Sequence, residues 1–217
     1  MSQLKIEIVS DVMCPWCVVG YKNLEKALSE LSPNLNAEIS WHAFELNPSM
    51  PTEGQNLSEH IMQKYGQTEQ QSEENRTRLT EIGKQAGFEF NFDQNSIMIN
   101  SFDCHRLLSW SKNYQKQTAL KLALFKAHFS DKIYLNDEEA LLKVVSQVGL
   151  QVAEAKGILS SNAYVDEVRT EQEQAQQMGV SSVPTFIINE KYAINGGQAV
   201  ETFKQALEQI SAETQSA

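Results

Sequence analysis

The chain is 217 residues long, with a formal net charge of −10 and 41% hydrophobic residues. This length predicts one large domain, or one domain carrying an insertion, that buries a core without disulfide staples. The acidic balance leaves no electrostatic basis for binding nucleic acid or an anionic membrane.

The cysteines and the first residues indicate the compartment. No apolar run approaches the length of a membrane span, and the N-terminus lacks a basic segment followed by an apolar signal core. Three cysteines, two of them in one motif, do not make a disulfide framework. We therefore expect a cytoplasmic protein, in which a cycling pair of thiols is favoured over a standing disulfide.

The first elements along the chain are a strand, a helix and a second strand. Residues 4–10 alternate like a strand, residues 15–31 have helical spacing, and residues 37–44 alternate again. A βαβ unit of this length predicts parallel strands.

Cys14-Pro15-Trp16-Cys17 stands where the first strand passes into the helix. Pro15 suits the first helical position, so Cys14 falls at the helix cap. Free backbone N–H groups and the helix dipole there predict a pKa for Cys14 below the usual value of about 8.5. We expect Cys14 to be the nucleophile and Cys17, one turn further on, to resolve a mixed disulfide.

The alternative interpretation of two cysteines at this spacing is half of a zinc site. Structural zinc needs four ligands, and this chain offers only Cys104 and four scattered histidines besides the motif. The strand before the motif and the Pro-Trp pair within it also favour redox chemistry, so we predict no metal site.

The middle of the chain is predicted to be an all-helical insertion. Helical spacing occurs in seven stretches, at residues 57–65, 68–86, 101–112, 115–129, 138–148, 152–159 and 163–178. Residues 88–92 alternate, but an apolar loop on the core fits them equally well. We place the insertion at residues 55–178, between the two parts of the remaining domain at residues 1–54 and 179–217.

The last part of the chain reads as a hairpin and a helix. A breaker cluster ends in Val183-Pro184, residues 185–188 and 192–195 are predicted strands around a tight turn, and a helix covers residues 199–210. Residues 211–217 are expected to be frayed.

The complete order, βαβ then helices then ββα, resembles the α/β thioredoxin fold with a helical insertion, the DsbA-like architecture. Four motifs resemble its FrnE-like cytosolic branch: Ser-Asp-Val-Met-Cys-Pro-Trp-Cys at 10–17, Phe-Glu-Leu-Asn-Pro at 44–48, Phe-Asp-Cys-His-Arg-Leu at 102–107 and Gly-Val-Ser-Ser-Val-Pro-Thr-Phe at 179–186. The resemblance implies a cis Val183–Pro184 bond across from Cys14, with the Val183 backbone positioned to pair with an extended substrate. Periplasmic relatives have His where this chain has Trp16, so we expect a milder oxidant or a reductase.

Other polar residues are weighed against plain structural roles. Trp16 is either a platform for substrate or an aromatic residue covering the insertion. Asp11 is expected to anchor the helix start or the loop. Cys104 is expected to be a small buried hydrophobic residue, with a third redox thiol as the alternative. His42 and Glu45 are also expected to have structural roles. His60 and His128 are expected at the surface or in helix packing. His105 is expected to line the roof of the cleft.

The predicted function is a thiol–disulfide oxidoreductase acting on protein or small-thiol disulfides. Cys14 and Cys17 are the predicted catalytic residues, with Pro15, Trp16, Val183 and Pro184 in substrate binding. No bound cofactor is expected, although glutathione could serve as redox partner, and the protein would be a monomer or homodimer. One alternative is a glutathione-dependent isomerase or transferase of the kappa or hydroxychromene-carboxylate isomerase type. Another is a non-catalytic, chaperone-like binder using the inter-domain cleft.

Overall fold

A four-stranded mixed sheet with the order β2-β1-β5-β6 organises the computed structural model, which describes residues 2–215. The parallel β1–β2 pair and the antiparallel β5–β6 hairpin confirm the predicted βαβ and ββα units. β5 joins them by pairing antiparallel to β1, with Ile8 opposite Phe186. The strands are β1 (Ser2–Ser10), β2 (Leu35–Ala43), β5 (Thr185–Ile188) and β6 (Tyr192–Asn195).

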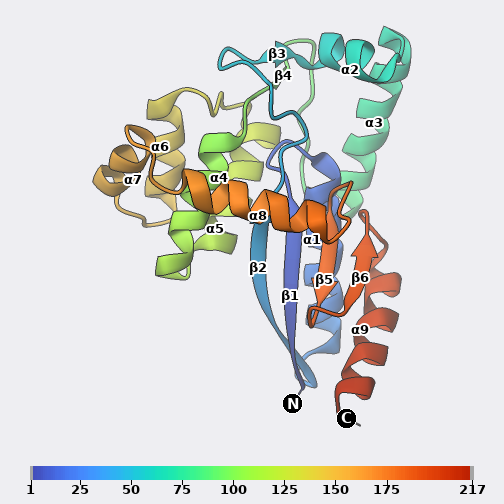
Figure 1. The fold of residues 1–217 in the computed structure, drawn as a ribbon. Coiled ribbons are helices and arrows are strands. Elements are labelled where there is room, and N and C mark those ends of the chain that lie inside the picture. The colour runs from blue at the N-terminus through green and yellow to red at the C-terminus, as the bar shows by residue number, and fades with distance from the viewer. Residues whose placement is uncertain (1, 216–217) are drawn as a thin grey trace.

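Two helices, α1 (Pro15–Leu31) and α9 (Val200–Gln215), pack against each other and the sheet. The apolar side chains of β1 are fully buried there, and the Phe186 and Phe203 rings meet edge to face at 4.9 Å. Figure 1 shows α9 beside β6, with both chain ends at the same end of the sheet. This layer is the thioredoxin fold that the sequence predicts.

The C-terminal helix is longer than predicted. α9 continues to Gln215 because Ile210 and Ser211 are still buried against the rest of the protein. The frayed segment expected at residues 211–217 is therefore wrong for residues 211–215, and residues 216–217 lie outside the described part of the chain.

The segment between β2 and β5 contains the predicted helices. They are α2 (Leu57–Tyr65), α3 (Glu69–Gln85), α4 (Phe102–Ser111), α5 (Gln117–Phe125), α6 (Glu138–Gln147), α7 (Val152–Leu159) and α8 (Val165–Gln177). Side chains cap several of them: Asn56 caps α2, Asp137 caps α6, and Thr68 forms a capping box with Gln71. Figure 1 shows α4–α7 grouped on the β2 side of the sheet.

The insertion is not all-helical, which corrects the prediction. β3 (Gln55–Asn56) and β4 (Ile97–Met98) form a small antiparallel sheet. Two-residue strands are too short for alternation to reveal them in a sequence. The 88–92 segment is an apolar loop, in which Phe90 is buried and stacks on Phe92 at 5.3 Å.

The insertion has its own core and also enters the core of the sheet. One buried cluster is built around helices α4–α7. The other combines the sheet, α1 and α9 with Phe90, Phe125 and Phe129 from the insertion. The boundaries at 54/55 and 178/179 stay a prediction. Among residues 2–215, no helix is both long and apolar enough to cross a membrane.

The Gln117 side chain forms hydrogen bonds with the backbone of edge strand β2, as a neighbouring strand would. The Gln117 amide accepts a hydrogen bond from Trp41 N at 2.9 Å and donates one to Trp41 O at 2.8 Å. Both groups are buried, so the amide satisfies backbone polar atoms that water does not reach. The edge is thereby protected from pairing with another chain.

Gln117→Leu is expected to lower the free energy of unfolding by about 2–4 kcal/mol, because two buried backbone groups lose their partners. Chemical denaturation of the purified variant measures the change. Gln174→Leu, an exposed glutamine on α8, is the control and should change stability by less than about 0.5 kcal/mol. Equal effects of the two substitutions would contradict the role given to Gln117.

Candidate active site

The cysteine motif has the predicted place at the start of α1. Cys14 is the N-cap residue, Pro15 is the first helical residue, and Cys17 N donates to Cys14 O at 3.0 Å. The preceding turn is fixed by Asp11, which accepts from Met13 N at 3.1 Å through its carboxylate. All three cysteines of the chain are free thiols.

Asp11 is a buried anchor, as predicted. Its second carboxylate oxygen accepts from Leu46 N at 2.7 Å, and His105 Nε2 lies 3.5 Å from the first. Although burial favours the protonated form, His105 and the Leu46 N–H hold the pKa of Asp11 below its ordinary value. His105 is therefore a partner of Asp11 and does not line the cleft, which corrects the sequence prediction.

The Val183–Pro184 peptide bond is cis, as the resemblance implies, and lies beside the first cysteine. Cys14 Sγ lies 3.6 Å from Val183 O, so two segments 169 residues apart meet at the reactive sulfur. Pro184 is buried against α1, where a Cβ atom on Gly20 would approach its ring to 3.2 Å. Pro184 itself does not line the cleft; it places Val183 there.

A lysine that the sequence did not single out lies beneath the cysteine pair. Lys121 of α5 is only 1% exposed, its Nζ is 3.4 Å from Ser10 O, and it lies over the Trp41 and Phe125 rings at 5.3 Å and 5.1 Å. Burial lowers the pKa of Lys121, while negative charge at Cys17 opposes that shift. The only feature of the sequence that indicates a buried Lys121 is its place in the apolar stretch around residues 120–125.

The two buried thiols ionise as a linked pair, and the site favours the thiolate of Cys17 over that of Cys14. Burial opposes ionisation of Cys17, yet the Cys14 thiol as hydrogen-bond donor, the Lys121 charge and the Ser10 hydroxyl lower its pKa. The hydrogen bond to Cys17, together with burial and the charge on Cys17, raises the pKa of Cys14 well above its ordinary value. The prediction that the free N–H groups and the dipole at the helix start lower the pKa of Cys14 is therefore wrong.

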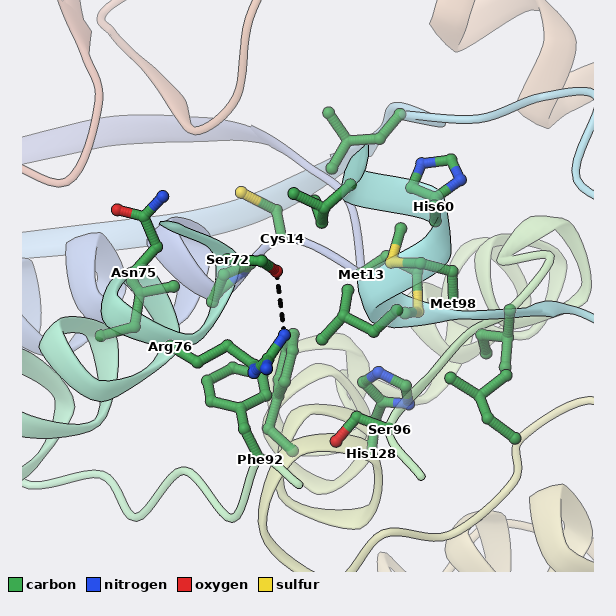
Figure 2. A pocket seen from close by; sticks show the side chains of 18 of the residues that line it. Met13, Cys14, His60, Ser72, Asn75, Arg76, Phe92, Ser96, Met98 and His128 are labelled. Atoms are coloured by element: carbon green, nitrogen blue, oxygen red, sulfur yellow. Dashed lines mark hydrogen bonds between the residues drawn. The ribbon is translucent and has the colours of Figure 1, made fainter. Parts of the chain in front are cut away.

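A cavity of about 740 Å³ opens on Cys14. Pro15, Trp16 and Val183, all predicted to bind substrate, line it, and Trp16 is 38% exposed. Trp16 also packs on Gly197, where an added Cβ atom would lie 3.1 Å from the Trp16 carbonyl oxygen. The other walls come from α2, α3, β4 and residues 128–134 of the insertion (Figure 2).

Two histidines expected at the surface or in helix packing belong to the cavity wall. Burial lowers the pKa of His128 to about 4, so its imidazole is neutral at neutral pH. His60 is also buried, its Nδ1 is 2.9 Å from Gln55 Oε1, and burial lowers its pKa. Both histidines line the cavity that opens on Cys14 (Figure 2).

The remaining candidates have structural roles, as predicted. Cys104 is buried away from the cavity, and burial raises its pKa to about 12. His42 lies 3.3 Å from Glu7 across the sheet, and Glu45 pairs with Arg169 at 2.5 Å. Among the described residues, no group of three or more His, Cys, Asp or Glu side chains is arranged to hold a metal ion.

Comparisons with known proteins agree with this geometry. The uncharacterized protein YwbO of Bacillus subtilis is 27% identical over 203 residues, covering 93% of this chain and 94% of its own. A crystal structure described as a probable DsbA oxidoreductase from Streptomyces coelicolor is 32% identical, with a TM-score of 0.90, over 95% of this chain and 89% of that one.

More distant structures share the fold only. The cytosolic disulfide reductase DsbM from Pseudomonas aeruginosa, solved with GSH, is 17% identical with a TM-score of 0.64, over 94% and 98% of the two chains. A 2-hydroxychromene-2-carboxylate isomerase is also 17% identical, with a TM-score of 0.70, over 98% of both chains.

A family model described as a DSBA-like thioredoxin domain matches residues 5–208, which is nearly the whole chain and includes both the cysteine pair and the cis-proline. The protein therefore belongs to the DsbA-like thioredoxin-fold oxidoreductase family.

Proposed function

We propose that the protein is a thiol–disulfide oxidoreductase in which Cys14 exchanges with substrate and Cys17 resolves the product. The observation that carries this proposal is the position of Cys14 Sγ, at the cavity wall and 3.6 Å from Val183 O, with Cys17 fully buried behind it. Only the first sulfur faces the space that a substrate can enter. The second faces Lys121 and Ser10.

The proposed cycle begins with a proton transfer inside the pair. The Cys14 proton moves along its hydrogen bond to Cys17, which leaves a Cys14 thiolate on the cavity side. This thiolate attacks one sulfur of the substrate disulfide, and the other sulfur leaves as a thiolate that takes a proton from solvent. No bound metal or organic cofactor takes part.

The second step releases the other half of the substrate. Cys17 loses its proton to solvent, because the positive charge of Lys121 stabilises the thiolate that forms, and this thiolate attacks Cys14 Sγ. A Cys14–Cys17 disulfide forms, the mixed disulfide breaks, and the second substrate thiol departs. The substrate gains two electrons and the cysteine pair loses them. An external thiol, such as glutathione, would return the pair to the reduced form.

The two alternatives have less support. The isomerase shares this fold, but this chain has an intact Cys14–Cys17 pair of free thiols, which a disulfide exchange reaction requires. A chaperone-like binder would use the same cavity without needing a buried cation beneath Cys17. The FrnE-like branch, the cytoplasmic location and a monomeric or dimeric state remain part of the proposal, supported by the motifs and the sparse cysteines.

Cys14→Ser is expected to reduce insulin reduction and glutathione exchange to the rate without enzyme, because the attacking sulfur is lost. Cys17→Ser should still complete the first step and accumulate a mixed disulfide on Cys14, visible by mass spectrometry. Cys104→Ala is the matched control and should retain activity, since this thiol is buried elsewhere. Full activity of Cys14→Ser would refute the proposed function.

Lys121→Met is expected to raise the lower pKa of the cysteine pair, because the substitution removes the cation that stabilises the Cys17 thiolate. At a pH between the wild-type pKa and the variant pKa, the variant contains less thiolate. The pH dependence of its thiol exchange rate therefore shifts to higher pH. Ultraviolet thiolate absorbance of the reduced protein measures this midpoint. Lys126→Met is the control, since Lys126 is exposed and pairs with Asp131 at 2.6 Å. An unmoved midpoint in Lys121→Met would contradict the role of Lys121.

A further inference from the structure

The path to the reactive sulfur runs through the cavity. Cys14 is only 4% exposed, and the cavity in front of it has a volume of about 740 Å³. This volume falls within the range of about 300–1,000 Å³ that is typical of small-molecule sites. The insertion therefore restricts which sulfur can reach Cys14.

Arg76 of α3 enters this cavity with half of its guanidinium unused. Its Nη1 donates to Ser58 Oγ at 2.8 Å and to Ser72 Oγ at 2.9 Å. Nε and Nη2 have no acceptor among the described side chains and backbone of residues 2–215. Figure 2 shows Arg76 reaching from its helix toward the interior, next to Ser72 and Phe92.

Among residues 2–215, Arg106 and Arg169 form ion pairs with carboxylates, whereas Arg76 and Arg78 form none. A half-buried guanidinium without a carboxylate partner is unexpected in a chain with a net charge of −10, where acidic side chains are abundant. Arg76 lines the cavity and also borders a second surface hollow with Glu59, Glu69 and Glu73, yet no described ion pair joins it to any of these carboxylates.

The other charged groups of the wall do not cancel this positive charge. Among the described lining residues, Asp93 is the one carboxylate, and Lys132 neutralises it at 2.6 Å. The lowered pKa values of His60 and His128 keep both imidazoles neutral at neutral pH. Arg78 adds a second positive charge at the same wall. The cavity therefore favours an anion.

The free edge of Arg76 has the shape that a carboxylate requires. Because two serine hydroxyls hold Nη1, the Nε–H and Nη2–H groups are fixed side by side, and such a pair binds both oxygens of one carboxylate. The rest of the wall is largely apolar, with Phe92, Ile97 and Ile133, and suits a short carbon chain.

We propose that the cavity binds low-molecular-weight disulfides or thiols that carry a carboxylate, with Arg76 holding the carboxylate while Cys14 exchanges with the sulfur. This inference rests on the proposed function and names its substrate class. In the exchange, Cys14 bonds to one sulfur, the other half leaves as a thiol after taking a proton from solvent, and Cys17 then releases the half bound at Arg76. Arg76 takes no part in bond breaking; it fixes the position of the substrate.

Three small symmetric disulfides that differ in charge test the proposal: dithiodipropionate carries carboxylates, cystamine carries ammonium groups, and hydroxyethyl disulfide is neutral. The wild type should have the highest kcat/KM for dithiodipropionate. Arg76→Gln should lower that value about tenfold or more, since a bidentate charged contact is lost, and change the value for hydroxyethyl disulfide by less than about twofold. Arg76→Lys should recover part of the loss.

The controls separate this inference from the proposed function. Lys84→Gln makes the same charge change on an exposed part of α3 and should leave all three values unchanged. Turnover of hydroxyethyl disulfide by Arg76→Gln shows that the variant folds. Equal kcat/KM for the three disulfides, or an equal loss for all three in Arg76→Gln, would overturn the carboxylate site while leaving the oxidoreductase function intact.

A binding measurement without chemistry completes the test. Calorimetry of dithiodipropionate with Cys14→Ser should show binding that disappears in the Cys14→Ser, Arg76→Gln double variant. If the wild type turns over none of the three disulfides but this binding is present, the proposed function fails and the carboxylate site stands. Absence of binding in Cys14→Ser would overturn the site.

Discussion

One face of helix α5 joins the insertion to the thioredoxin layer and fixes the active site. Gln117, Lys121 and Phe125 follow each other at four-residue intervals, so all three point toward the sheet. Gln117 completes the edge of β2, Lys121 approaches the end of β1 at Ser10, and Phe125 enters the core shared with α1. A shift of α5 would therefore disturb the edge of β2, the pKa values of the cysteine pair and the core shared with α1 at the same time.

The buried cation explains how an acidic protein ionises a cysteine pair without water around it. Burial alone raises the pKa of a thiol, and Asp11 nearby acts in the same direction on Cys14. Lys121 opposes this effect, because its positive charge lies beneath Cys17 and lowers the pKa of that thiol. The helix cap contributes little to the pKa of Cys14, because the Cys14 thiol donates its proton in a hydrogen bond that stabilises the Cys17 thiolate.

Local patterns were enough to predict the thioredoxin layer and the two cysteines, since strand alternation, the Pro15 helix start and the hairpin turn are all encoded within a few residues. The site beyond the cysteines was not predictable in this way. Lys121, His60, His128 and Arg76 lie on helices whose periodicity says which face is apolar but not what that face meets. β3 and β4 were missed because their pairing joins residues about forty positions apart, with two residues on each side.

The insertion contributes both to the chemistry and to the selection of substrate, through cations on opposite sides of the cysteine pair. Lys121 lies on the buried side and stabilises the resolving thiolate. Arg76 lies on the cavity side and forms no ion pair with a carboxylate of residues 2–215. Exchange itself depends on the sheet, α1, the cis-proline and Lys121 of α5. A family member with the same thioredoxin layer and a different α2–α3 wall should therefore exchange thiols equally well on a different substrate. Specificity can change here without altering the residues that perform the reaction.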